Sequence, residues 1–115
     1  MDGPTPRSLA NLLRSVAILA LPASDQTAWV ESLGVGPVVD ELALELGDGA
    51  RLADQFVAKG WLGSEALPPL QALDALLEDM SGPNNAHVWD VSALKSSPRW
   101  AEARVKAQEV LFAIH

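Results

Sequence analysis

Apolar residues recur every three or four positions along most of the chain, which is the period of an α-helix with one buried face. Thr5 followed by Pro6 predicts the first helix start, because a hydroxyl accepts a hydrogen bond from a first-turn amide and proline leaves no amide unpaired. An apolar stripe then runs from Leu9 to Leu19, and Pro22 follows it. The pattern predicts an amphipathic helix from Pro6 towards Pro22.

Further segments with the same period predict shorter helices along the rest of the chain. Hydroxyl residues and prolines are expected to start them, and glycines or lysines to end them. The expected starts lie at Ser24, Gly36–Pro37, Asp48, Ser64 or Leu67, and Ser97–Pro98. One more helical turn is expected after Asp90. The sequence thus predicts five to seven helices with short connections.

Two closely spaced glycines interrupt the third of these segments. Gly47 and Gly49 would each cost roughly 1 kcal/mol inside a helix. The chain is therefore expected to break or bend there, with Asp48 as the cap of the fourth helix. Whether the third and fourth helices are continuous is left open by the pattern.

The composition supports an all-α fold. Alanine and leucine each occur 18 times among 115 residues, whereas there is no tyrosine and β-branched residues are sparse. Alanine and leucine favour helices, whereas tyrosine and β-branched residues favour strands. We predict a compact single-domain bundle that spans residues 1–115, a length sufficient to bury one core.

No targeting or membrane segment is expected. The most apolar early stretch, Ser15–Ala23, is interrupted on its N-terminal side by Arg14, and Leu21 is a poor residue for the −3 position of a cleavage site. No run approaches the roughly 18–20 apolar residues of a membrane span. We expect a cytoplasmic protein, and the complete lack of cysteine fits a reducing compartment.

The negative charge is concentrated in the middle of the chain. The net charge is −7 overall, but residues 25–90 hold twelve carboxylates against Arg51 and Lys59, a net charge of −10. Such a segment repels nucleic-acid phosphates and anionic membranes. It suits a basic protein partner, because complementary charge speeds encounter and suppresses wrong partners. The alternative is that the charge serves only solubility.

The segment "MSGPNNAHVWD", residues 80–90, is the most chemically varied part of the chain. With Glu78 and Asp79, its His87 and Asp90 would be candidate ligands of a divalent metal. No predicted helix carries the histidine together with one of these carboxylates at i, i+3 or i+4, however, and no metal-binding motif is present. A surface loop that contacts a partner is a further possibility.

A connector between two helices explains every residue of this segment. Gly82 ends the preceding helix and Pro83 prevents its continuation, while the asparagines bond the backbone of the turn. Trp89 is expected to pack into the core, and Asp90 to cap the next turn. We interpret the segment as a connector, and expect neither metal nor cofactor.

Other enzyme chemistries find no support in the sequence. No serine lies in a nucleophile elbow, and "GVGP" and "GDG" lack the spacing and the lysine of a phosphate loop. Paired carboxylates on the third and fifth helices could serve acid–base catalysis, but at helical spacing they are expected to form a solvated face. The sequence predicts a protein that is not an enzyme.

Three stretches together resemble a known group of proteins: "VDELALEL" (Val39–Leu46), "LDALLEDMSGPNNAHVW" (Leu73–Trp89) and "SPRWAEARVKAQEVL" (Ser97–Leu111). They are similar to small acidic, all-helical bacterial proteins, some of which look like immunity proteins for polymorphic toxins. The similarity covers about the last two thirds of the chain. It implies a non-enzymatic binding protein, and brings no catalytic residues with it.

These observations lead to two functional expectations. The first is a non-enzymatic interaction domain, an immunity protein or antitoxin whose acidic surface covers a basic toxin. The expected contact residues are Asp40, Glu41, Glu45, Asp48, Asp74, Glu78, Asp79 and an exposed Trp61. The second is a self-associating structural domain, such as a homodimer, that uses an apolar patch at Trp61, Leu62 or Pro68–Pro69.

Overall fold

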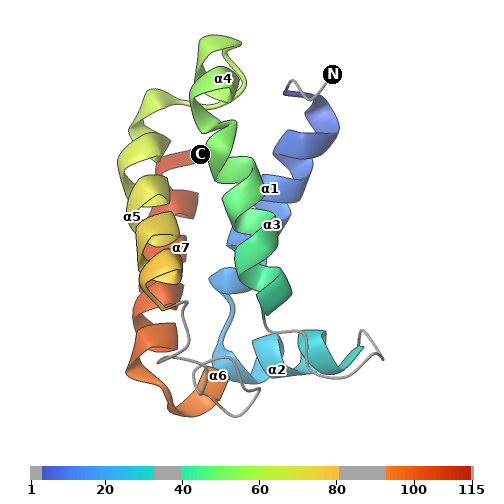
Figure 1. Cartoon of the computed structure of the whole chain (residues 1–115), viewed down its shortest axis with the longest axis vertical. Coiled ribbons are helices and arrows are strands. Elements are labelled where there is room, and N and C mark those ends of the chain that lie inside the picture. The colour runs from blue at the N-terminus through green and yellow to red at the C-terminus, as the bar shows by residue number, and fades with distance from the viewer. Residues whose placement is uncertain (1–3, 33–39, 81–92, 115) are drawn as a thin grey trace.

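Helices make up the whole of the described secondary structure (Figure 1). The computed structural model describes residues 4–32, 40–80 and 93–114, without the side chains of residues 40–42 and 114. The elements are α1 (Pro6–Leu19), α2 (Ala23–Ser32), α3 (Asp40–Arg51), α4 (Ala53–Ala58), the 3-10 helix η1 (Ser64–Ala66), α5 (Leu67–Asp79), α6 (Ala93–Ser96) and α7 (Pro98–Ile114). The prediction of an all-α bundle of five to seven helices is confirmed.

The four long helices α1, α3, α5 and α7 pack in a ring. α1 packs on α3 and α7, and α5 packs on the same two helices. Figure 1 shows α4 at one end of this bundle and α2 with α6 at the other. In this ring α3 and α5, which are joined in the chain through α4 and η1, lie side by side.

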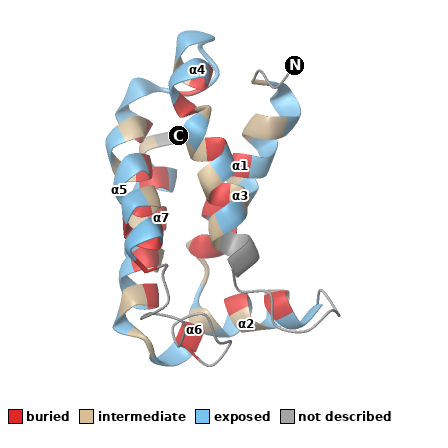
Figure 2. Ribbon diagram, viewed as in Figure 1, coloured by how far each residue is buried: buried red, intermediate tan, exposed pale blue. Residues whose placement is uncertain are grey.

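The apolar stripes predicted from the sequence meet inside this ring. Buried positions face inward on each long helix (Figure 2). Trp100 of α7 and Phe56 of α4 are the largest fully buried side chains, and Leu12, Leu46 and Leu73 pack with them. Burying an aliphatic or aromatic side chain contributes about 1.5–3 kcal/mol, so this contact between stripes is what holds the helices together.

Two predicted helix starts are confirmed. Thr5 forms a capping box with Ser8: its hydroxyl accepts from the Ser8 amide at 3.0 Å, and the Ser8 hydroxyl accepts from the Thr5 amide at 2.8 Å. α5 begins at Leu67, so that Pro68 falls in its first turn, where proline breaks no helical hydrogen bond. Both helix starts are determined by residues that lie close together in the chain.

Other expected boundaries are wrong. Ser24 is the second residue of α2 rather than its cap, and Ser64 opens the short 3-10 helix that precedes α5. The expected break at the two glycines is also wrong, since α3 continues through them to Arg51. The interruption comes at Leu52, which carries no side-chain cap, and Asp48 lies inside α3.

Packing explains why α3 contains Gly49. A Cβ atom at this position would lie 2.6 Å from Cβ of Leu12 and 2.7 Å from its Cδ1. α1 therefore approaches the bare backbone of α3 at Gly49. The glycine serves close contact between helices, and the tertiary contact outweighs its low helix propensity.

A buried polar network joins four helices at the α2–α6 end of the bundle. Gln26 of α2 is fully buried, and its amide nitrogen donates to the carbonyl oxygens of Ile18 at 3.2 Å and Leu19 at 2.8 Å in α1. Arg104 of α7 donates to the amide oxygen of Gln26 at 3.1 Å and to the carbonyl of Leu94 in α6 at 2.8 Å. Burial lowers the pKa of the Arg104 guanidinium. The bond to Leu19 satisfies a carbonyl at the end of α1, whereas the carbonyl of Ile18 also accepts from the Leu21 amide at 3.1 Å.

Candidate partner-binding groove

A groove of about 320 Å³ lies between α3 and α5. It is lined by Ala43, Leu44, Gly47 and Arg51 from α3 and by Asp74, Leu77 and Glu78 from α5. These positions repeat every three or four residues on both helices, so each helix contributes one face. The groove therefore follows from the side-by-side packing of two regular helices and from the short side chains on the α3 side.

The lining combines apolar and acidic groups. Leu77 is buried beneath the groove, whereas Leu44 on the α3 side is 57% exposed. Asp74 is half-buried and Glu78 is exposed, one helical turn apart on α5. An apolar surface beside two carboxylates suits a ligand group that is both aliphatic and positively charged.

Gly47 forms part of the α3 wall. A Cβ atom added there would meet nothing closer than Oδ1 of Asp74, at 3.9 Å, which is an ordinary van der Waals distance. No packing contact of the described residues thus requires a glycine at this position, in contrast to Gly49. The missing side chain leaves open space in the groove, at a cost of about 1 kcal/mol of helix stability.

The negative charge of Asp74 is only partly balanced by positive charge nearby. Burial raises its pKa above the ordinary value of 3.8, and the neighbouring Glu78 carboxylate raises it further. The positive charge of Arg51 lowers the pKa by a smaller amount. Arg51 itself is 78% exposed, and its guanidinium contacts Oδ1 of Asp48 at 3.3 Å. The groove therefore holds negative charge that the protein's own cations do not fully balance.

We expect Asp74→Asn to raise the melting temperature at neutral pH. Because the folded-state pKa of Asp74 lies above its unfolded value, ionisation of this group destabilises the folded protein. The wild-type protein loses this penalty as the pH falls through the folded-state pKa. The advantage of Asp74→Asn should therefore shrink as the pH is lowered and vanish below about 3.8, the unfolded value.

Thermal unfolding followed by circular dichroism between neutral and acidic pH measures this difference. Asp48→Asn is the matched control, since it removes the same charge from an exposed position on the neighbouring helix. Its effect should stay within about 0.5 kcal/mol, as is usual for surface substitutions. An advantage of Asp74→Asn that grew towards acidic pH would contradict the prediction.

The predicted contact acids do not form one continuous surface. Asp74 and Glu78 line the groove, whereas Glu45 and Asp48 line a smaller hollow of about 110 Å³ between α1 and α3. Asp40 and Glu41 are the first residues of α3, and their side chains lie outside the described part. Of the six predicted contact residues whose side chains are described, Asp74 and Glu78 therefore meet at the groove.

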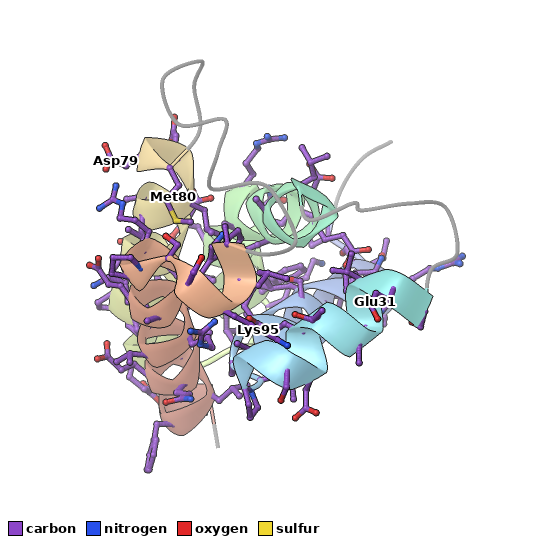
Figure 3. All side chains as sticks on the ribbon, turned by 90° about the horizontal axis from the view of Figure 1, so that it is seen from below. Glu31, Asp79, Met80 and Lys95 are labelled. Carbon is purple, nitrogen blue, oxygen red and sulfur yellow. The ribbon has the colours of Figure 1, made fainter. Side chains whose placement is uncertain are left out.

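Asp79 lies apart from the groove, at the end of α5. Its carboxylate forms an ion pair with Arg99 of α7. Figure 3 shows Asp79 pointing away from the molecule, whereas the adjacent Met80 points inward, where it is buried. The charge of Asp79 is offset by Arg99, so it contributes less than Asp74 to attraction of an outside cation.

Trp61 lies beyond α4 and is 38% exposed, so the expectation of an exposed tryptophan is confirmed. Its ring stacks on Phe56, with centroids 6.2 Å apart, and Nζ of Lys59 lies 5.5 Å from the ring centroid. The charged group beside the ring is thus a cation. Leu62 is only 7% exposed, because it packs into the core, so the expectation that it belongs to an exposed apolar patch is wrong.

Sequence reasoning missed three residues of the groove. Leu44 falls off the apolar stripe that the sequence predicts at Leu42 and Leu46, and an apolar residue outside the stripe was a usable signal. Arg51 and Gly47 carried no such signal, since their roles depend on where α5 packs. The connector expected at residues 81–90, with His87, lies outside the described residues.

The described residues contain no group of three or more histidine, cysteine, aspartate or glutamate side chains placed to hold a metal ion. None of the described helices is long and apolar enough to cross a membrane. Comparison with known protein families, curated proteins and solved structures found no match for this chain.

Proposed function

We propose that the protein is a non-enzymatic interaction domain that binds a basic protein partner through the α3–α5 groove. The observation that carries this proposal is the groove itself, where the half-buried Asp74 and the exposed Leu44 and Glu78 stand together. Interfaces commonly combine an apolar centre with charges that select the partner. The proposed biological role is that of an immunity protein or antitoxin.

A toxin that acts on nucleic acid needs a basic site to hold phosphates. An acidic helical protein that covers such a site would block substrate and be attracted by the same field. The net charge of −10 in residues 25–90 supports this role. The identity of the proposed target is thus limited to a chemical class, a protein with an exposed basic surface.

The test is capture of the partner from lysate of the source organism, followed by titration of the purified pair. We expect affinity to fall at least tenfold between about 50 mM and about 500 mM salt, because salt screens charges at an interface. Asp74→Asn/Glu78→Gln should weaken binding by a similar factor. Glu65→Gln/Glu109→Gln is the matched control, since it removes two carboxylates elsewhere on the surface.

Two results would contradict the proposal. If the partner is not basic, or if its affinity does not depend on salt, charge does not direct the contact. If the two double variants bind equally well, the carboxylates of the groove have no special part, and the negative charge serves only solubility.

Self-association is the second candidate function, and one observation favours it. Three apolar side chains in the middle and last turns of α7 are exposed: Val105 by 53%, Leu111 by 38% and Phe112 by 79%. Exposed apolar side chains suit a contact between two copies. Sedimentation equilibrium over a hundredfold range of concentration tests it: a dimer supports this candidate, and a monomer throughout eliminates it.

A further inference from the structure

We propose that the α3–α5 groove takes a single long cationic side chain of the partner, an arginine or a lysine. Its aliphatic stem would lie over Gly47 and Leu44, and its charged end would meet the carboxylates of Asp74 and Glu78. This inference rests on the proposed function, and names the chemical group that the groove recognises.

The size of the groove limits what it can hold. Its volume of about 320 Å³ is at the lower end of the range for ligand pockets, about 300–1,000 Å³. A helix, with an outer diameter of about 10–12 Å, would rest on the outside of such a groove rather than enter it. One extended side chain from the surface of a partner is the fitting occupant.

The shape of the α3 wall favours an aliphatic stem. At Gly47 the nearest atom to an added Cβ would be Oδ1 of Asp74, so the space above the glycine leads directly to that carboxylate. Leu44, one turn earlier on α3, presents an exposed apolar side chain next to this space. Lysine and arginine both carry three or four methylenes that lie against apolar surface while the charged end reaches a polar partner.

The charge of the groove favours a cation at its inner end. Asp74 and Glu78 are one turn apart on α5, so a guanidinium or ammonium group between them contacts both. Arg51 is the only cation among the residues that line the groove, and its guanidinium is bonded to Asp48 at the exposed side of α3. A cation from outside would therefore complete a charge balance that Arg51 provides only in part.

The experiment titrates the ¹⁵N-labelled protein with three blocked pentapeptides, each with two alanines on either side of a central residue. The central residue is arginine, lysine or citrulline, the last being a neutral analogue of arginine. We expect the arginine and lysine peptides to shift the amide signals of the groove residues, and the citrulline peptide to bind at least tenfold more weakly, because it lacks the charge.

Two variants test the position of the bound side chain. Gly47→Leu fills the space over α3 and should lower the affinity for the arginine peptide at least tenfold. The melting temperature should be unchanged or higher, since leucine favours helix. Asp74→Asn should lower the affinity by a similar factor. Asp54→Asn is the matched control for charge, because Asp54 is exposed on α4 outside the groove lining, and it should change the affinity by less than about twofold.

Each alternative outcome overturns the inference in a recognisable way. If the arginine peptide binds and the Asp74 and Asp54 variants weaken its binding equally, cations bind the acidic surface without the groove. In that case the proposed function stands and this inference fails. If no peptide shifts the groove signals, the inference also fails, and the salt dependence of the captured partner decides the proposed function separately.

Discussion

Replacing Gln26 with leucine should lower the free energy of unfolding by about 2 kcal/mol, because a buried carbonyl loses its side-chain donor and a half-buried guanidinium loses an acceptor. The carbonyl oxygen of Leu19 would lose the Gln26 amide, and Arg104 would keep only its bond to the carbonyl of Leu94, whereas the carbonyl of Ile18 still accepts from the Leu21 amide at 3.1 Å. Leucine has a similar volume, so the loss reports hydrogen bonding rather than a cavity. For a domain with a total stability of about 5–15 kcal/mol, this is a large change.

Urea unfolding followed by circular dichroism measures the effect. Ser15→Ala is the matched control, since Ser15 is equally buried but donates only to the carbonyl of Leu12 within its own helix. The Leu12 carbonyl lies in the helix interior and keeps its backbone hydrogen bond, so loss of the Ser15 bond should cost less than about 1 kcal/mol. A Gln26→Leu variant as stable as Ser15→Ala would show that the network contributes little to folding.

The elements that were predictable from the sequence depend on local chemistry. Thr5–Pro6 and Ser97–Pro98 start helices because the groups that satisfy the first turn are adjacent in the chain, and the Ser97 hydroxyl does accept from the Arg99 amide. The apolar period similarly predicted which faces are buried. An all-α bundle follows from such signals without knowledge of how the helices are arranged.

Features that depend on contact between distant segments were not predictable. Gln26 resembles any polar residue on a short helix, and only the approach of α1, α6 and α7 makes it a buried hub. For the same reason the acids of α3 and α5 were expected to act together, although Glu45 lines the hollow beside α1 and Asp74 lines the α3–α5 groove. The candidate site was therefore predictable in its charge but not in its shape.

The two glycines of α3 provide the sharpest test of this distinction. Gly49→Ala should lower the free energy of unfolding by about 2 kcal/mol, because overpacking costs about 1–3 kcal/mol and outweighs the gain in helix propensity. The new Cβ would lie 2.6 Å from Cβ of Leu12, an atom fixed to the α1 backbone, so rotation of a side chain cannot relieve the clash. α1 and α3 would have to separate.

Gly47→Ala is the matched control, since it makes the same change two residues earlier in the same helix. It should raise the free energy of unfolding by about 1 kcal/mol, the usual gain of alanine over glycine in a helix, because its Cβ meets only Oδ1 of Asp74 at 3.9 Å. Chemical unfolding of both variants measures the difference. If both substitutions change the free energy of unfolding equally, helix propensity, rather than the approach of α1, determines what α3 tolerates. Changes of opposite sign would place the close helix contact at Gly49 and leave Gly47 as open space in the groove.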